Sequence, residues 1–343
     1  MKKPTIEISR RDAMALGAVF VGLFIFALWT VGLVGSSSIS SALRLTVPIG
    51  FAAMGGIFAE KAGVINIGLE GLLIIGAFGA IASLYALSVT PIGASIWLAF
   101  AFAVVASTVV ALLFAIVCIE FKADQIIAGL AVWLIALGFA PFASYIIWDQ
   151  TNSPSVGSFS AWAIPGLSDL PVIGGLFVAT PPVILLIIAV PVSWYLLNRT
   201  TFGMWIEASG EDPKSLDTAG VDVRKVRYAG VLLSGVYCGI GGAGMALTVG
   251  QFVGSGDTMM DGRGFIGLTA YLIGNYNPIA AFFASFLFAG LEALQIQVQQ
   301  IAGFDVSSRL IGIIPYVTVL VVLAFVGKTQ MPSSAGDHYE SDD

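Results

Sequence analysis

Charged residues are scarce in this sequence. Only 10% of the 343 residues are Asp, Glu, Lys or Arg, whereas hydrophobic residues make up 57%. A soluble domain of this length needs a polar surface that this composition cannot supply. The composition therefore excludes a soluble globular protein and favours a chain that lies in a lipid bilayer.

Groups that could carry out catalysis are also nearly absent. The single histidine, His338, lies close to the C-terminal end, which leaves no Ser–His or Cys–His pair in the apolar part of the chain. The cysteines, Cys118 and Cys238, fall in apolar runs and suit packing better than a disulfide. No GxxxxGK[ST] phosphate loop and no cluster with metal-ligand spacing occurs. We expect neither an enzyme nor a metal or cofactor, and nothing resembles a nucleic-acid footprint.

The apolar residues form runs of about 18 to 25 residues, the length that a helix needs to cross ~30 Å of hydrocarbon. These runs must be helical, because lipid offers no partner for an unpaired backbone amide. The sequence therefore predicts an all-α membrane protein of about ten transmembrane helices. The first run is too long for the apolar part of a signal peptide. The expected spans are residues 13–35, 42–58, 71–88, 94–119, 124–148, 181–197, 229–249, 263–275, 278–298 and 308–327.

The distribution of basic residues predicts the orientation. With the N-terminus in the cytosol, only Arg44, Arg263 and Arg309 of the 15 lysines and arginines lie outside or near the outer ends, and the other 12 lie inside. The opposite orientation would contradict the positive-inside rule. We therefore expect a multi-pass protein of the cytoplasmic membrane with both termini in the cytosol.

The spans divide into two units of opposite direction, spans 2–5 and spans 7–10. This arrangement is typical of an inverted repeat with a pathway at its interface. Residues 1–328 are expected to form one transmembrane domain, with an outer loop at 149–180 and an inner loop at 198–228. Residues 329–343 are expected to be an acidic, disordered tail in the cytosol.

The inner loop contains a short punctuated helix in the segment GEDPKSLDTAGV, residues 210–221. Asp212 is a suitable N-cap, Pro213 suits the first helical position, and Gly220 suits a left-handed stop. The predicted helix, Pro213 to Ala219, is too short to be stable alone in water. It could dock into another protein or belong to an ordinary structured loop, and the residues leave both readings open.

Two further segments place polar residues next to apolar spans. In FAEKAGVINIGLEG, residues 58–71, glycines interrupt an apolar stretch that also holds Glu60, Lys61, Asn66 and Glu70. Asn66 and Glu70 would share one face of a helix. A carboxylate in lipid is costly, so Glu70 is a candidate for a functional role. The alternative is a segment at the cytosolic interface with Glu60 and Lys61 solvated.

The other segment is GRGFIGL, residues 262–268. Arg263 could pair with Asp261 at the outer interface, or Arg263 and Phe265 could line the outer half of a pathway. Glu292 adds a polar group to span nine. Gly235 and Gly239, at GxxxG spacing, point to close helix packing.

Together these segments resemble a known family. FAEKAGVINIGLEG with LLIIGAFGA, then ASGEDPKSLDTAGVDVRKVRYAG, then GRGFIGLTAYLIGNYNPIAA are similar to the permease subunits of ATP-binding-cassette (ABC) importers of nucleosides. That family is related to the permeases for simple sugars and for branched-chain amino acids. The resemblance covers residues 42 to 298.

The resemblance implies the type II importer fold and a set of partners. These are a second, similar permease, a two-cassette cytosolic ATPase and an external substrate-binding lipoprotein. It also implies a translocation pathway near Asn66 and Glu70, and Arg263 and Phe265 are the candidates for its outer half. The coupling helix that would sit in the ATPase groove comprises Glu211, Asp212, Pro213, Leu216, Ala219 and Gly220.

Two other functions are weighed against this one. An ion-coupled secondary transporter would need ionisable groups within the membrane, and only Glu70 and Glu292 qualify. A structural or receptor-like membrane protein would not need broken helices. By resemblance the solute is expected to be a nucleoside, with simple sugars and branched-chain amino acids as the alternatives.

Overall fold

The computed structural model describes residues 36–91, 93–170, 173–299 and 330–339. The predicted spans at 13–35 and 308–327 lie outside these residues. Within them, the long helices are α2 (Ser36–Lys61), α3 (Leu69–Ser88), α4 (Ile96–Ala115), α5 (Gln125–Trp148), α6 (Pro181–Arg199), α9 (Val223–Val249) and α11 (Pro278–Gln299). The shorter elements are the π-helical turn η1 (Ile116–Glu120), β1 (Trp162–Ala163), the 3-10 turn η2 (Ile173–Phe177), β2 (Val178–Ala179), α7 (Thr201–Glu211), α8 (Pro213–Thr218) and α10 (Arg263–Ile273).

Seven of the described helices are long and apolar enough to cross a membrane. Each coincides with a predicted span, which confirms the all-α membrane fold in this part of the chain. The predicted span at 263–275 differs, because α10 has only 11 residues. A helix of that length covers about 16 Å, roughly half of the hydrocarbon layer. The prediction of a complete span there is wrong.

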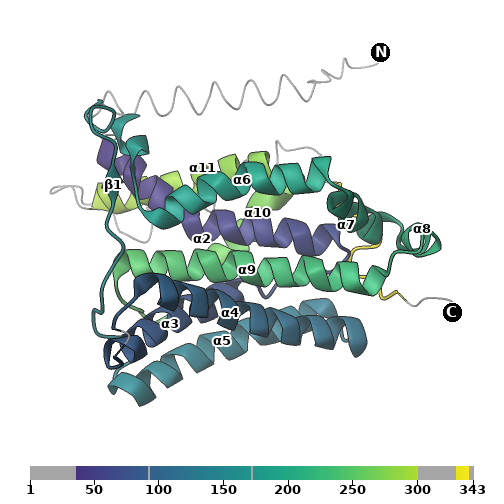
Figure 1. Cartoon of the computed structure of the whole chain (residues 1–343), viewed down its shortest axis with the longest axis horizontal. Coiled ribbons are helices and arrows are strands. Elements are labelled where there is room, and N and C mark those ends of the chain that lie inside the picture. Colours follow the sequence, from purple (N-terminus) through teal and green to yellow (C-terminus); the bar gives the residue numbers. More distant parts are fainter. Residues whose placement is uncertain (1–35, 92, 171–172, 300–329, 340–343) are drawn as a thin grey trace, which may run out of the picture.

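Helix α9 lies at the centre of the molecule (Figure 1). It packs against α3 and α4 of the first unit and against α2. In the same way α2, the first helix of its unit, packs against α10 and α11 of the second. The first helix of each unit therefore contacts the second and third helices of the other, as expected for two inverted units.

The close packing of α9 depends on its glycines. A Cβ on Gly239 would lie 2.8 Å from the Cα of Val104 in α4, and one on Gly242 would lie 2.1 Å from the carbonyl oxygen of Leu73 in α3. Real Cβ atoms do not approach backbone this closely, so these positions require glycine. The packing role predicted for Gly235 and Gly239 is confirmed, and the glycine-lined contact extends to Gly242.

One end of the molecule, which we call the β1 end, is covered by the described residues of the loop 149–180, namely 149–170 and 173–180 (Figure 1). Strands β1 and β2 pair antiparallel, with Trp162 opposite Ala179. The first part of the loop is bound to the end of α9 and the residues after it: the amides of Ser153 and Phe159 donate to the carbonyls of Phe252 and Leu247, both at 2.8 Å. The loop is therefore an ordered cap.

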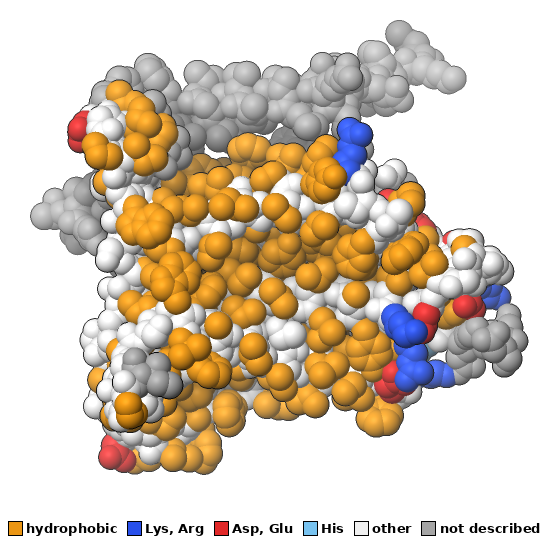
Figure 2. Space-filling model, in the orientation of Figure 1, with side chains coloured by type: hydrophobic (Ala, Val, Ile, Leu, Met, Phe, Trp, Pro, Cys, Tyr) orange, Lys and Arg blue, Asp and Glu red, His pale blue; other side chains and the backbone are white. Residues whose placement is uncertain are grey.

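The opposite end, which we call the α8 end, carries α7, α8 and the segment 330–339, drawn in yellow in Figure 1. Figure 2 shows a broad apolar band between the two ends, with lysine and arginine side chains gathered beside α7 and α8. An apolar band bounded by polar ends is the surface expected of a protein that crosses a bilayer.

Candidate functional site

Helix α3 does not continue directly from α2 but follows the irregular segment 62–68. Gly63, with φ of +93°, turns the chain, and the amide of Ile65 donates to Oε1 of Gln125 at 2.7 Å. Asn66 accepts from the amide of Gly68 at 3.0 Å and donates to Oγ of Ser234 at 2.9 Å. Both ends of this buried amide side chain are thus occupied, and they fix the point where α3 begins.

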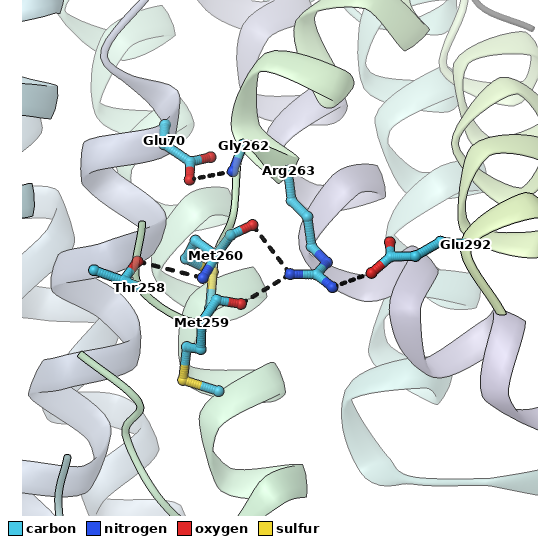
Figure 3. A network of polar contacts seen from close by, with 7 residues as sticks. All are labelled: Glu70, Thr258, Met259, Met260, Gly262, Arg263 and Glu292. Atoms are coloured by element: carbon cyan, nitrogen blue, oxygen red, sulfur yellow. Dashed lines mark hydrogen bonds and ion pairs between the residues drawn. The ribbon is translucent and has the colours of Figure 1, made fainter. Parts of the chain in front are cut away.

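Glu70, in the first turn of α3, reaches the N-terminus of α10 (Figure 3). Its two oxygens accept from the amides of Gly262 at 2.9 Å and Gly264 at 2.5 Å. The N-termini of α3 and α10 therefore meet at one buried carboxylate. The positive ends of both helix dipoles favour a carboxylate at this point. Two helices from opposite units whose N-termini meet inside the protein are typical of a transporter core.

Arg263 occupies the other side of this junction. Its guanidinium donates to the carbonyls of Met259 at 2.8 Å and Met260 at 3.1 Å, and it forms an ion pair with Glu292 of α11 (Figure 3). The interpretation that Arg263 pairs with Asp261 at the outer interface is therefore wrong. Arg263 is buried and Asp261 exposed, because the turn before α10 carries the arginine inward.

Phe265 differs from the other three pathway candidates. Asn66, Glu70 and Arg263 are 1%, 1% and 7% exposed. Phe265 is half-buried, and its ring contacts that of Trp133 in α5 at a centroid distance of 5.1 Å. The structure thus brings the four residues to one region around the start of α10, where three are enclosed by protein and one retains accessible surface.

A second buried carboxylate lies nearer the α8 end. Glu60 is 3% exposed and accepts from the hydroxyls of Tyr271 at 2.5 Å and Tyr276 at 2.7 Å. The alternative that Glu60 is solvated is wrong, although Lys61 does lie at the surface, 3.2 Å from Glu207. The two tyrosines gave no signal in the sequence, because their partner is more than 200 residues away.

The predicted short helix of the inner loop is present as α8, one residue shorter than expected. The Asp212 carboxylate accepts from the amide of Ser215 at 3.3 Å, and Gly220 ends the turn with φ of +77°. Glu211, Asp212, Ala219 and Gly220 are exposed, but Pro213 and Leu216 are buried against the rest of the chain. The first four can face a partner, whereas Pro213 and Leu216 hold α8 in place.

Helix α7, which precedes α8, was not predicted. Its N-cap is Thr200, whose hydroxyl accepts from the amide of Gly203 at 3.2 Å. This cap was the signal that could have revealed it. Met204 and Trp205 on α7 are 61% and 40% exposed. The α8 end therefore presents two consecutive helices rather than one.

Residues 330–339 also differ from the prediction of a disordered tail. They pack against the α8 end, with the amide of Ser334 donating to the carbonyl of Gly210 at 2.8 Å and that of Gly336 to Gly63 at 3.1 Å. The carbonyl groups at the end of α7, which have no partner within the helix, bind part of this segment. Amino-acid composition does not reveal such a contact. Residues 340–343 lie outside the described part of the chain.

Within the described residues, no group of three His, Cys, Asp or Glu side chains is arranged to hold a metal ion. The side chains of Asn66, Glu70 and Arg263 form hydrogen bonds and an ion pair with other segments, while Nε of Arg263 has no hydrogen-bond partner in the part of the chain that the structure describes. Such groups can orient helices and shape a pathway. The arrangement defines a membrane permease built from two inverted units, with a pair of short helices at one end.

Comparison with known proteins agrees with this class. Residues 38–323 match the family described as the permease component of the branched-chain amino acid transport system. The chain belongs to this family, which confirms the resemblance found in its motifs. It is therefore a transport subunit, a multi-pass membrane permease of an ABC transporter.

The curated relatives include permeases with named solutes. The chain is 34% identical over 312 residues to the nucleoside ABC transporter permease protein NupC of Lactococcus lactis, covering 88% of this chain and 96% of that protein. It is 34% identical to the guanosine ABC transporter permease protein NupQ of Bacillus subtilis, covering 88% and 95%. It is 31% identical to the putative glucose ABC transporter permease protein TsgC13 of Haloferax volcanii, covering 80% and 86%. No solved structure matches the chain significantly.

Proposed function

We propose that this chain forms half of the translocation pathway of an ABC importer for nucleosides. The observation that carries this proposal is α8, a six-residue helix capped by Asp212 and stopped by Gly220, which projects from one end of the bundle. Two relatives that match along nearly their whole length are permeases for a nucleoside and for guanosine. This supports a nucleoside in preference to a sugar or a branched-chain amino acid.

The proposed orientation places the α8 end in the cytosol. Lysines and arginines gather there, beside α7 and α8 (Figure 2). The positive-inside rule then puts the loop 149–180 outside. Both termini in the cytosol require ten crossings, of which one is the path from Phe252, bound to that loop, to Tyr276, bound to Glu60, with α10 as only its helical part. In this orientation α8 faces the compartment that holds ATP.

The proposed partners follow from this orientation and from what the chain lacks. The chain has no phosphate loop, so a two-cassette cytosolic ATPase would supply the energy through α8. A second permease would complete the pathway, and an external binding lipoprotein would deliver the solute to the β1 end. Asn66, Glu70 and Arg263 would shape the pathway wall from within the protein, and Phe265 would be the member of the group that can touch the solute.

The contacts of the buried carboxylates bear on the alternative, an ion-coupled secondary transporter. Glu70 accepts hydrogen bonds from two backbone amides, Glu60 accepts them from two tyrosine hydroxyls, and Glu292 is paired with Arg263. A coupling carboxylate must bind and release its ion during each cycle, which would break these contacts. This favours the ABC importer.

The proposal is tested by uptake of radiolabelled guanosine into proteoliposomes containing the two permeases, the ATPase and the binding protein. We expect uptake that requires ATP and is competed by other nucleosides but not by glucose or leucine. Uptake by this chain alone, driven by a proton or sodium gradient, would instead establish the secondary transporter. Competition by glucose or leucine would reassign the solute.

The coupling role of α8 gives a first prediction. Replacing Gly220 with valine forces a β-branched residue into φ of +77°, a conformation that costs about 1–2 kcal/mol for residues other than glycine. We expect ATP-driven guanosine uptake to fall by roughly tenfold, since 1.4 kcal/mol is tenfold in an equilibrium constant. The measurement is the initial uptake rate at equal amounts of assembled complex.

The matched control is Gly93→Val. Gly93 has the same φ of +77° and, like Gly220, nothing within 4 Å of its Cβ position, but it lies in the loop between α3 and α4 at the other end. Its replacement imposes equal strain away from α8 and should leave uptake within about twofold. If both variants lose uptake to the same extent, α8 has no special part in coupling.

A further inference from the structure

Residues 330–339, which we call the strap, form a compact turn over the α8 end. Within the strap, the amide of Ala335 donates to the carbonyl of Pro332 at 3.1 Å, and the amide of Asp337 donates to the carbonyl of Ser334 at 3.2 Å. Pro332 is buried. The strap therefore has a definite conformation of its own.

The strap covers the C-terminus of α7. Besides the bond from the Ser334 amide to Gly210, the Ser333 hydroxyl lies 3.0 Å from the carbonyl of Glu211 and 2.6 Å from its carboxylate. The last carbonyls of a helix have no partner within the helix. The strap supplies these partners at the junction between α7 and α8.

The strap also reaches both inverted units. Gly336 donates to Gly63 in the segment 62–68 and accepts from Nε2 of Gln125 at 3.4 Å. A Cβ on Gly336 would lie 3.0 Å from the side chain of Ile65, so the strap fits closely against this segment. In the second unit, the amide of Gln330 donates to Oδ1 of Asn275 at 2.8 Å.

Two further contacts complete the attachment. The buried side chain of Arg227, near the start of α9, donates to the carbonyl of Asp337 at 2.7 Å. The hydroxyl of Tyr339 donates to Oδ2 of Asp217 on α8 at 2.7 Å. One ten-residue segment thus binds α7, α8, α9, the segment 62–68 and the loop before α11.

We propose that the strap is a positioning element that joins α8 to the pathway, beside the direct hydrogen bond at 2.8 Å from the Ser209 hydroxyl of α7 to the carbonyl of Ala62. A displacement of α8 is carried by the strap to the segment 62–68, which determines where α3 begins. Glu70 is the second residue of α3, and its carboxylate binds the N-terminus of α10. This inference rests on the proposed coupling role of α8, and it assigns to residues 330–339 the link between α8 and the segment 62–68.

Truncation tests the proposal. A variant that ends before Gln330 lacks the strap, and we expect the number of solute molecules imported per ATP to fall by roughly tenfold, within the range of about 5- to 150-fold for coupling between sites. ATP hydrolysis by the same complex should stay within about twofold. A variant that is only misfolded would lose solute uptake and ATP hydrolysis together. A loss of uptake with hydrolysis retained therefore identifies an uncoupled permease.

The matched control ends before Glu340. It removes the carboxylates of Glu340, Asp342 and Asp343 but keeps the whole strap. We expect full uptake per ATP. If the variant lacking the strap imports as well as this control, the proposal is overturned.

A smaller change keeps the proposal testable if the variant without the strap fails to assemble. Tyr339→Phe removes one hydroxyl that binds α8, and it should lower uptake per ATP by about threefold, since a single hydrogen bond contributes about 0.5–1.5 kcal/mol. Tyr195→Phe, at an exposed tyrosine of α6, is the control and should change nothing. Equal behaviour of the two variants would contradict the positioning role.

A distance measurement separates this proposal from the proposed function. Spin labels at the exposed positions Lys214 on α8 and His338 on the strap can be introduced, because both native cysteines are buried. We expect one narrow distance distribution in the permease alone, unchanged when the ATPases bind ATP. A broad distribution, or one that shifts with nucleotide, would overturn the strap as a rigid connection. A wild-type complex without ATP-driven uptake would instead refute the proposed function.

Discussion

Replacing Glu70 with leucine is expected to lower the free energy of unfolding by about 2–6 kcal/mol, because each of two buried amides left unpaired costs about 1–3 kcal/mol. These are the amides of Gly262 and Gly264 at the start of α10. Leucine has a similar volume but no acceptor. The measurement is chemical unfolding of the purified permease in detergent micelles.

Glu70→Gln should fall between leucine and the wild type, because its amide oxygen can accept one of the two hydrogen bonds. The control is Glu207→Gln. The Glu207 side chain is 58% exposed and forms a surface ion pair with Lys61, so its loss should cost no more than about 1 kcal/mol. A Glu70→Leu protein as stable as Glu207→Gln would show that Glu70 does not hold the N-termini of α3 and α10 together.

Replacing Gly242 with alanine is expected to separate α9 from α3. The added Cβ would lie 2.1 Å from the carbonyl oxygen of Leu73 and 2.9 Å from the amide nitrogen of Ala77. Both atoms belong to the backbone, so no side chain can turn away and the helices themselves must move. Overpacking of this kind costs about 1–3 kcal/mol or more. Chemical unfolding in micelles again measures the effect.

Gly138 of α5 provides the opposite case. Nothing lies within 4 Å of its Cβ position, so alanine fits there. Because alanine favours a helix by about 1 kcal/mol over glycine, Gly138→Ala should be neutral or slightly stabilising. If Gly242→Ala and Gly138→Ala unfold alike, the contact between α9 and α3 tolerates a wider separation than the structure shows.

The spans of the described residues could be predicted because burial in lipid requires long apolar runs, which a sequence displays directly. The same criterion failed at α10. Between Arg263 and Asn275 the sequence is mostly apolar, but hydropathy cannot show that the helix starts inside the protein, where Glu70 caps it. That contact joins residues more than 190 positions apart.

The candidate site was foreseen in part. Asn66, Glu70 and Arg263 were selected as polar residues next to apolar runs, and all three lie around the starts of α3 and α10. Their partners could not be foreseen, since Glu292 and the amides of Gly262 and Gly264 are defined only by the fold. The strap was missed for the same reason. Three of its partners are the backbone carbonyls of Gly63, Gly210 and Glu211, which every sequence contains, and the side chains that it binds lie far away along the chain.

Helix α9 has a mechanical consequence that follows from its two attachments. At one end Arg227 binds the strap, and near the other end Leu247 binds the loop 149–180, as does Phe252 just after the helix. A continuous helix of 27 residues is a stiff rod about 40 Å long. Tilting such a rod by about 3° about one end moves the other by roughly 2 Å. A tilt of α9 therefore moves both attachments at once, so a movement of α7 and α8 also displaces the loop 149–180 at the other end.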